Sequence, residues 1–382
     1  PELAPSVPYH ARGTHGTEDT HDACVDFAIN GIDRDGFPYS TWRKLARAAV
    51  SEEDESLVSR SPFQGERALR EQLARYLYMS RGVRTEPEQI VIGAGTDNLL
   101  QMLSYVLAGS CTIAMEDPVY HEAYLFFRRM GHPVRSVPID DCGLPVESLA
   151  GLTDAAVYLT PAHQFPLGIT MPISRRIELL NWAGAKSGRY LIEDDYDSEF
   201  RYNSKPVPAM KSIDSGGRVI YLGSFSRTIS PALRISYMVL PETLIDDYRV
   251  CCAPFGCCVS KLDQLVLTRF LAGGHFEGHL NKMRKVYRER RAHLVAALEC
   301  AFHGRIEIHG ICAGQHVPIR ISGLSEDELI ARARRAGVKI YPISPYFIEG
   351  VPRKYAGVVL IGYGTLAEDE IDEGITRLKT VW

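Results

Sequence analysis

Between about Ser51 and Leu240, apolar runs of strand length alternate with stretches of helical periodicity, such as Thr96–Ala108 and Ser174–Ala185. Strands that alternate with helices predict βαβ units and a mostly parallel sheet. Most of the runs are apolar at every position, which is typical of a sheet covered on both faces. The predicted strands are Gln89–Gly93, Thr112–Met115, Val134–Ile139, Ala155–Leu159, Tyr190–Glu193, Val219–Leu222 and Ile235–Leu240.

After about Asp246 the pattern changes to a long helical region, Ser260–Glu299, followed by strands and two further helices. Each of those two helices opens on an S/T-x-x-E capping box, at Ser325 and at Thr365. This order predicts a second, smaller α+β lobe, which we expect the early segment Val25–Val50 to join. The predicted strands of the small lobe are Ile306–His309, Val317–Ile321, Val338–Ile343 and Val358–Ile361.

The expected organisation is therefore a large domain at 51–255, a small domain formed by 23–50 and 290–382, and an interdomain helical region at 256–289. Residues 1–22 are polar and predict a flexible linker. Three histidines in this segment could bind metal or belong to a solvated tail: His10, His15 and His21.

Composition narrows the class of protein. The 382 residues are 45% hydrophobic and 24% charged, which excludes collagen, coiled coil and wholesale disorder. No window of 18 consecutive apolar residues predicts a membrane span. The net charge of −4 argues against nucleic-acid binding by bulk electrostatics.

The nine cysteines predict free thiols in a reducing cytoplasm, since no signal peptide opens the sequence. Two adjacent pairs form a CCxxxxCC cluster at 251–258. The cluster could hold zinc, although the usual metal knuckle is CxxC. The alternative is small side chains in a packed segment.

Three motifs could carry chemistry. The first is the turn Gly93–Asn98, which follows a predicted strand and opens a predicted helix. Such a turn presents backbone N–H groups to an anion, typically a phosphate, although glycine can also serve only to tighten the turn.

The second motif is an acidic run at the end of the strand Tyr190–Glu193, the edge at which open α/β sheets bind ligands. A carboxylate there could hold a magnesium ion or a protonated ring nitrogen, or the charges could belong to a solvated loop. The acidic residues are Glu193, Asp194, Asp195, Asp197 and Glu199.

The third motif runs from Tyr221 to Tyr237 and carries Ser224, Ser226, Arg227 and Arg234 after a strand end. Hydroxyls and guanidinium groups in this order are suited to binding an anion, and a surface turn is the alternative.

Together the three motifs resemble fold-type-I pyridoxal-phosphate enzymes, and most closely the aminotransferase-like effector domain of MocR/GabR-type transcription regulators of the GntR family. The resemblance covers about residues 23–382. It implies an α/β fold with a large doubly wound domain, a small α+β domain and a homodimer. The matching stretches include SPFQGERALREQLARYLYMSRGV, VIGAGTDNLLQML, EDPVYHEAY, RYLIEDDYDSEFRY, VIYLGSFSRTISPALRISYMVLP and GGHFEGHLNKMRKVYRERR.

The resemblance also implies a role for each matching position in binding pyridoxal 5′-phosphate. Asp194 matches the carboxylate that pairs with the ring nitrogen, and Tyr120 the aromatic residue that stacks on the ring. Tyr196 matches a hydroxyl near the ring oxygen, and either His163 or Gln164 a polar contact to that oxygen. The implied phosphate ligands are Gly95, Thr96, Ser224, Ser226 and Arg234.

The sequence departs from the family pattern at its central position. The family motif S-x-S-K ends in the lysine that forms a Schiff base with the cofactor, whereas this chain has Arg227. A guanidinium stays protonated and forms no ordinary imine. Any pyridoxal phosphate is therefore expected to bind without a covalent bond to the protein.

A second departure concerns the substrate. The arginine that holds the α-carboxylate in aminotransferases would fall near Leu360, and no arginine is there. Glu122 stands where a GABA-responsive regulator has a carboxylate-binding arginine. A carboxylate there would repel an acid and could accept an amine, unless Glu122 points to solvent.

Two further patterns have ordinary alternatives. His275 and His279 are spaced i, i+4, but the glutamate of the zinc-protease motif is displaced. The basic run between Lys282 and Arg291 could contact DNA phosphates or form a solvated, charged helix.

The leading hypothesis is a regulator's effector domain that senses a small amine or amino acid, with DNA contacted only through a helix-turn-helix that is not in this chain. The alternatives are a free-standing pyridoxal-phosphate aminotransferase, an engineered Lys-to-Arg variant of a pyridoxal-phosphate-binding regulator domain, and a cofactor-free dimerisation module. Arg227 and Leu360 count against the enzyme, and the retained Asp194, Ser224 and Arg234 count against the module.

Overall fold

The computed structural model describes residues 25–51, 55–107, 111–202, 207–310 and 313–382. The expected linker 1–22, with its three histidines, lies outside these residues. The larger of the sheets has seven strands, and only β8 runs antiparallel to the others. In spatial order the strands are β2 (Ile90–Gly93), β8 (Ser236–Val239), β7 (Val219–Ser224), β6 (Arg189–Asp195), β5 (Ala155–Leu159), β3 (Thr112–Asp117) and β4 (Val134–Pro138).

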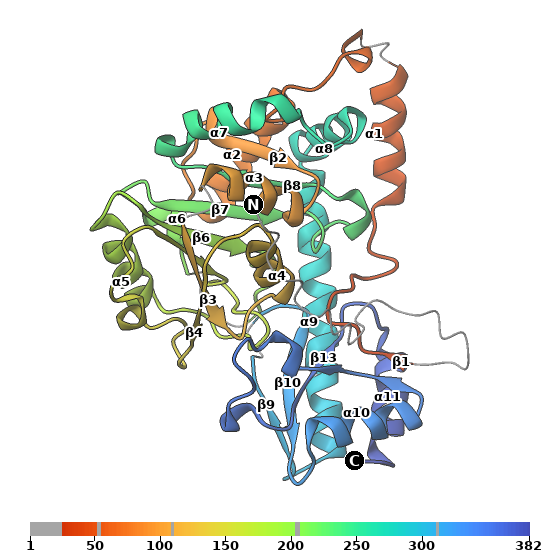
Figure 1. The fold of residues 1–382 in the computed structure, drawn as a ribbon. Coiled ribbons are helices and arrows are strands. Elements are labelled where there is room, and N and C mark those ends of the chain that lie inside the picture. Colours follow the sequence, from red (N-terminus) through yellow and green to blue (C-terminus); the bar gives the residue numbers. More distant parts are fainter. Residues whose placement is uncertain (1–24, 52–54, 108–110, 203–206, 311–312) are drawn as a thin grey trace.

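Helices cover both faces of this sheet (Figure 1). Ile90 and Ile92 of β2 pack in a core with α2 (Arg67–Arg81) and α8 (Lys261–Ala272), while Val91 packs on the opposite face against α3 (Thr96–Val106). Successive strand residues point to opposite faces, so a strand buried on both sides must be apolar at every position. The prediction of a doubly covered, mostly parallel sheet is confirmed.

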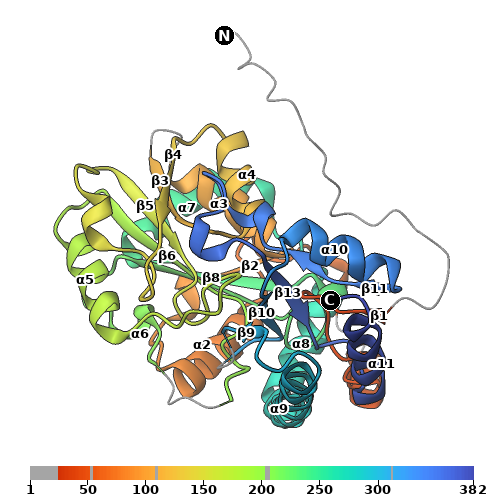
Figure 2. The same cartoon turned by 90° about the horizontal axis from the view of Figure 1, so that it is seen from below.

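A four-stranded antiparallel sheet forms the core of the smaller lobe (Figure 2). Its order is β12 (Tyr341–Pro342), β13 (Val358–Gly362), β10 (His316–Ile321) and β9 (Ile306–Ile308). A separate parallel pair joins β1 (Val25–Asp26) to β11 (Val338–Lys339), which attaches the N-terminal segment to this lobe.

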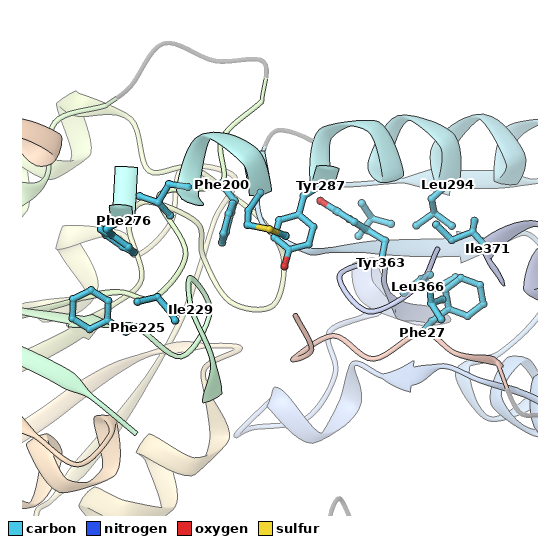
Figure 3. Close-up of a cluster of buried hydrophobic side chains, with 14 of the residues drawn as sticks. Phe27, Phe200, Phe225, Ile229, Phe276, Tyr287, Leu294, Tyr363, Leu366 and Ile371 are labelled. Atoms are coloured by element: carbon cyan, nitrogen blue, oxygen red, sulfur yellow. The ribbon is translucent and has the colours of Figure 1, made fainter. Parts of the chain in front are cut away.

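The long helix α9 (His275–Ala301) runs from the large lobe into the small one (Figure 1). Figure 3 shows the buried side chains along it, from Phe225 and Phe276 at one end to Leu294 and Ile371 at the other. The expected boundary between residues 289 and 290 therefore falls inside a continuous helix. The other helices are α1 (Tyr39–Ser51), α4 (His121–Arg129), α5 (Ile173–Gly184), α6 (Met210–Ile213), α7 (Ile245–Cys252), α10 (Glu326–Arg335) and α11 (Glu368–Lys379).

Two sequence predictions were wrong about continuity. The helical region Ser260–Glu299 is two helices, because Gly273 and Gly274 interrupt it and Gly274 adopts a φ of 68°. The strand Val338–Ile343 is divided into β11 and β12, which belong to different sheets. The spacing of apolar residues does not reveal the break between α8 and α9 or the break between β11 and β12.

The two capping boxes had different outcomes. Ser325 caps α10 as predicted: its hydroxyl accepts from Glu328 N–H at 3.3 Å, and the Glu328 carboxylate accepts from Ser325 N–H at 2.9 Å. The second box was wrong, because α11 begins two residues later than the motif implies, at Glu368 with Ala367 as its N-cap. Glu370 accepts from the N–H of Ala367 at 2.8 Å, and the Thr365 hydroxyl takes no part.

No helix in the described part of the chain is long and apolar enough to cross a membrane.

The close approach between β13 and the N-terminal segment gives a first prediction. Gly362 N–H donates to Phe27 O at 2.9 Å, and a Cβ at Gly362 would lie 2.0 Å from Ala28 O. Gly362→Ala should destabilise the protein by about 1–3 kcal/mol, because backbone rather than a flexible side chain must move. Urea unfolding measures this change as a shift of the midpoint at unchanged slope.

Gly278 provides the matched control, because it lies within α9 and its added Cβ would meet nothing within 4 Å. Gly278→Ala should stabilise the protein by about 0.5–1 kcal/mol, the gain expected for alanine over glycine inside a helix. Equal effects of the two substitutions would contradict the packing of β13 against residues 27–29.

Candidate functional site

The motif-bearing segments meet at one edge of the large sheet. Parallel strands end at the same edge, so the residues that follow β2, β3, β5, β6 and β7 converge there. They line a cavity of about 230 Å³. The lining residues are Asn30, Thr96, Asp97, Tyr120, Thr160, Phe165, Asp194, Tyr196, Ser224, Ser226, Arg227, Pro231 and Arg234.

One end of the cavity is formed by the turn between β2 and α3. The N–H of Ala94 donates to Asn98 Oδ1 at 3.0 Å, which fixes the turn, and Gly95 at the helix start has a φ of 88°. A Cβ at Gly95 would lie 2.3 Å from Arg234 Nη2, so glycine allows the guanidinium to lie against the turn. Arg234 also pairs with Asp97 at 3.0 Å, and both side chains are exposed.

The loop after β7 forms the adjoining wall. Ser224 Oγ accepts from the N–H of Ser226 at 3.1 Å and from Ser236 Oγ at 2.9 Å. The 3₁₀ turn Pro231–Leu233 then delivers Arg234, whose φ of 49° is the left-handed conformation that residues other than glycine rarely adopt. Two hydroxyls, a guanidinium and the first residue of α3 thus line the same cavity.

Asp194 lies at the C-terminal end of β6, where it accepts a hydrogen bond from the Tyr158 hydroxyl. The pKa of Asp194 is raised to about 7: burial is the largest cause and raises it, the hydrogen bond from Tyr158 lowers it, and the negative charge of Asp195 raises it. The positive charge of Arg227 also lowers this pKa, but by less than burial raises it. Asp194 is therefore a buried carboxyl group that a cation in the cavity would ionise.

The other acidic residues of the run form hydrogen bonds and ion pairs with neighbouring elements of the large lobe. Glu193 accepts from the N–H groups of Met210 and Lys211 at 2.8 and 2.9 Å and so caps α6. Asp195 is 2.8 Å from Arg81 and accepts from the Tyr221 hydroxyl at 2.6 Å.

Glu199 accepts from the Tyr76 hydroxyl at 2.9 Å, and Asp197 is 2.9 Å from His163 Nδ1. All five acidic residues are buried or half-buried. The solvated-loop alternative was therefore wrong, and within the run Asp194 alone lines the cavity.

Aromatic rings form the remaining walls. Tyr120, directly before α4, packs edge-on against Phe165 with ring centroids 6.1 Å apart. The Tyr196 hydroxyl is 2.9 Å from His163 Nδ1, so His163 lies behind Tyr196 and outside the cavity lining. Gln164 is also outside the lining: its amide donates to the carbonyl oxygens of Pro118 and Phe165 at 2.8 Å each.

Arg227 lines the cavity between these walls. Its Nη1 donates to the backbone oxygen of Ile29 at 2.8 Å, and its Nη2 donates to Asn30 Oδ1 at 2.5 Å. The guanidinium carbon lies 5.9 Å from the Tyr196 ring centroid. Arg227 therefore joins the loop after β7 to the N-terminal segment that follows β1.

The substrate-related positions lie elsewhere. Glu122, in the first turn of α4, is exposed and does not line the cavity. Leu360 is fully buried in β13, in a cluster of apolar side chains that belong mostly to the large lobe, such as Leu159 and Phe165.

Sequence reasoning missed five lining residues. Asp97 and Pro231 lie inside the first and third motifs but were given no role. Thr160 directly follows a predicted strand, so the strand-edge argument that found Asp194 could also have found it. Phe165 directly follows His163 and Gln164, the two positions that the resemblance singled out. Asn30 carried no signal, because its position depends on the tertiary approach of the N-terminal segment.

The remaining candidate motifs have structural roles. On α9, Arg284 donates to Glu199 O at 2.8 Å, and Arg290 pairs with Asp33 at 2.6 Å, so the basic run is only partly a solvated surface. His279 Nε2 is 2.6 Å from Thr228 O. The sulfurs of Cys252 and Cys257 lie against backbone carbonyl oxygens at 3.8 Å. Among the described residues, no three His, Cys, Asp or Glu side chains are grouped so as to hold a metal.

Comparison with known proteins connects this site to two kinds of protein. The family model for aminotransferase class I and II matches residues 23–370. The uncharacterized HTH-type transcriptional regulator YdeL of Bacillus subtilis is 39% identical over 359 residues, which is 94% of this chain and 77% of that protein. The probable rhizopine catabolism regulatory protein MocR of Rhizobium meliloti is 33% identical over 348 residues, which is 91% of this chain and 70% of that protein.

Among solved structures, the multiple substrate aminotransferase of Thermococcus profundus matches with a TM-score of 0.84 at 26% identity. The match covers 95% of this chain and 92% of that one. The enzymes therefore share the fold, while the curated proteins of higher identity are regulators. The chain belongs to the aminotransferase class I and II family and, within it, is related to the aminotransferase-like domains of MocR-type transcriptional regulators.

Proposed function

We propose that this chain is the ligand-sensing effector domain of a MocR-type regulator, and that its cavity binds pyridoxal 5′-phosphate or a related anionic ligand without a covalent bond. One observation carries the proposal. Of the ten positions that the resemblance assigns to the cofactor, eight line a single cavity: Thr96, Tyr120, Asp194, Tyr196, Ser224, Ser226, Arg227 and Arg234.

The chemistry of the two ends of the cavity fits this ligand. The α3 N-terminus, the two serine hydroxyls and Arg234 would hold the phosphate, because all are hydrogen-bond donors that line the same cavity. Asp194 would hold a protonated ring nitrogen. The positive charge of that nitrogen would lower the raised pKa of Asp194 and ionise its carboxyl group. Tyr120 and Tyr196 would lie against the ring. A cavity of about 230 Å³ suits a ligand of one ring rather than a dinucleotide.

The identity of residue 227 favours ligand binding over catalysis of transamination. When bound, the cofactor supplies an electron-withdrawing ring that activates an attached amine. Transamination also needs an amine on the protein that forms an imine and moves protons, and Arg227 can do neither. This chain can hold and orient such a ligand, but it offers no lysine at the position where the chemistry takes place.

Through Arg227, ligand binding could also affect other parts of a regulator. It holds the N-terminal segment through Ile29 O and Asn30, and Asn30 itself lines the cavity. An occupant that displaces Arg227 would therefore move this segment. In the proposed regulator a small amine or amino acid is the effector, the domain forms a homodimer, and a helix-turn-helix contacts DNA.

The covalent state at residue 227 is testable. Borohydride treatment of the protein with pyridoxal phosphate should leave no reduced adduct on the SFSR peptide, because the peptide has no primary amine. Arg227→Lys should yield that adduct, detected by mass spectrometry, if the other groups of the cavity bind the cofactor. A Lys variant that binds no pyridoxal phosphate would refute the proposed cavity, and an adduct at Arg227 would refute the non-covalent mode.

The role of Asp194 is tested by Asp194→Asn, a nearly isosteric change. Pyridoxal-phosphate binding should weaken by about 1.5–3 kcal/mol, the range for a hydrogen bond to a charged group. Isothermal titration calorimetry measures the effect, and Glu122→Gln, exposed and outside the cavity, is the matched control. An unchanged dissociation constant in Asp194→Asn would show that Asp194 does not contact the ligand.

The same substitution should change the pH dependence of stability in the ligand-free protein. The pKa of Asp194 rises from its ordinary value of 3.8 to about 7 on folding, so the folded wild type loses stability as pH rises between these values. Asparagine does not titrate. The advantage of Asp194→Asn in unfolding free energy should therefore grow by about 2 kcal/mol from about pH 5 to about pH 8. A pH-independent difference in urea unfolding would contradict the buried, titrating carboxyl group.

A further inference from the structure

The guanidinium of Arg227 lines the cavity with only neutral hydrogen-bond partners. It donates to a backbone carbonyl and to the amide oxygen of Asn30, which use two of its five N–H groups. Among the described residues, no carboxylate lies within 4.0 Å of its nitrogens. Three donors and a full positive charge thus remain for an occupant of the cavity.

The acidic groups nearby do not neutralise this charge. Asp97 pairs with Arg234, and Asp194 accepts from the Tyr158 hydroxyl. Burial holds the pKa of Asp194 near 7 even though Arg227 lowers it, so Asp194 is not a full counter-ion at neutral pH. Glu122 is exposed and outside the lining.

A partly buried charge is costly unless an opposite charge pairs with it. In the proposed binding mode the phosphate already has its own ligands in Arg234, Ser224, Ser226 and the α3 N-terminus, which line the same cavity. A second anionic group on the same ligand would neutralise the charge of Arg227. A guanidinium has the planar donor geometry that matches a carboxylate.

We propose that the ligand is a pyridine 5′-phosphate derivative that also carries a carboxylate, and that Arg227 is its carboxylate-binding residue. This inference rests on the proposed function and defines the ligand class of the same cavity. The carboxylate can be borne by an amino acid joined to the pyridoxyl group or by the ring itself. In either case the guanidinium would pair with a carboxylate.

The test compares ligands that differ only in the carboxylate. Calorimetry with N-(5′-phosphopyridoxyl)glycine and N-(5′-phosphopyridoxyl)methylamine should show the glycine probe binding the wild type about tenfold to a hundredfold more tightly. A second pair, 4-pyridoxic acid 5′-phosphate and pyridoxine 5′-phosphate, places the carboxylate on the ring. A preference within the first pair assigns it to an amino acid, and one within the second pair to the ring; either supports the inference.

Two variants should remove the preference by different means. Arg227→Gln removes the charge. Asn30→Asp keeps the arginine but supplies a counter-ion of the same shape at the atom that Nη2 contacts at 2.5 Å. In both, the carboxylate preference should fall to within about threefold, while the methylamine probe still binds. Arg249→Gln removes an exposed arginine of α7 and should leave the preference unchanged.

The outcomes separate this inference from the proposed function. Equal binding of both members of each pair by the wild type overturns the carboxylate role and leaves a pyridoxyl-phosphate cavity in place. Loss of both methylamine and glycine probes in Arg227→Gln, with both retained in Arg249→Gln, also overturns it, because Arg227 would then hold the phosphate. No binding of any probe by the wild type overturns both proposals.

Discussion

The contact between Arg227 and the N-terminal segment connects the parts of the structure that matter for function. The loop after β7 carries the arginine, residues 29–30 receive two of its hydrogen bonds, and the cavity lies beside both. A lysine has one terminal nitrogen and could not span these acceptors with the same planar fork. Arg227, at the position of the family's Schiff-base lysine, thus also joins the cavity to the segment that follows β1.

The acidic residues on either side of Asp194 attach β6 to its surroundings. Glu193, Asp195, Asp197 and Glu199 are each engaged by a different partner, from a helix cap to the buried Arg81. These contacts join the end of β6 to several elements of the large lobe. Asp194 accepts a hydrogen bond from Tyr158, and no salt bridge joins it to a cationic side chain among the described residues. In the proposed function, a cationic ring nitrogen of the ligand takes that place.

The sequence predicted much of this structure because the determining signals are local. All seven large-sheet strands were predicted within a few residues, since most of them are covered on both faces and therefore continuously apolar, while the edge strand β4 is only partly buried. Asp194 and Ser224 were found because strand ends of a parallel sheet share an edge. Asn30 could not be found, because its place in the cavity depends on a contact between residues about 200 positions apart in the chain. The breaks at Gly274 and between β11 and β12 were missed because periodicity does not register a change of direction or of sheet partner.

The most direct test of the central claim is a crystal structure of the wild-type chain grown with pyridoxamine 5′-phosphate, which cannot form an imine with any lysine. The account predicts its phosphate at Thr96, Ser224, Ser226 and Arg234 and its ring nitrogen beside Asp194, with no bond to residue 227. Ligand bound only elsewhere on the protein, or a cavity that stays empty at saturating concentration, would contradict the account.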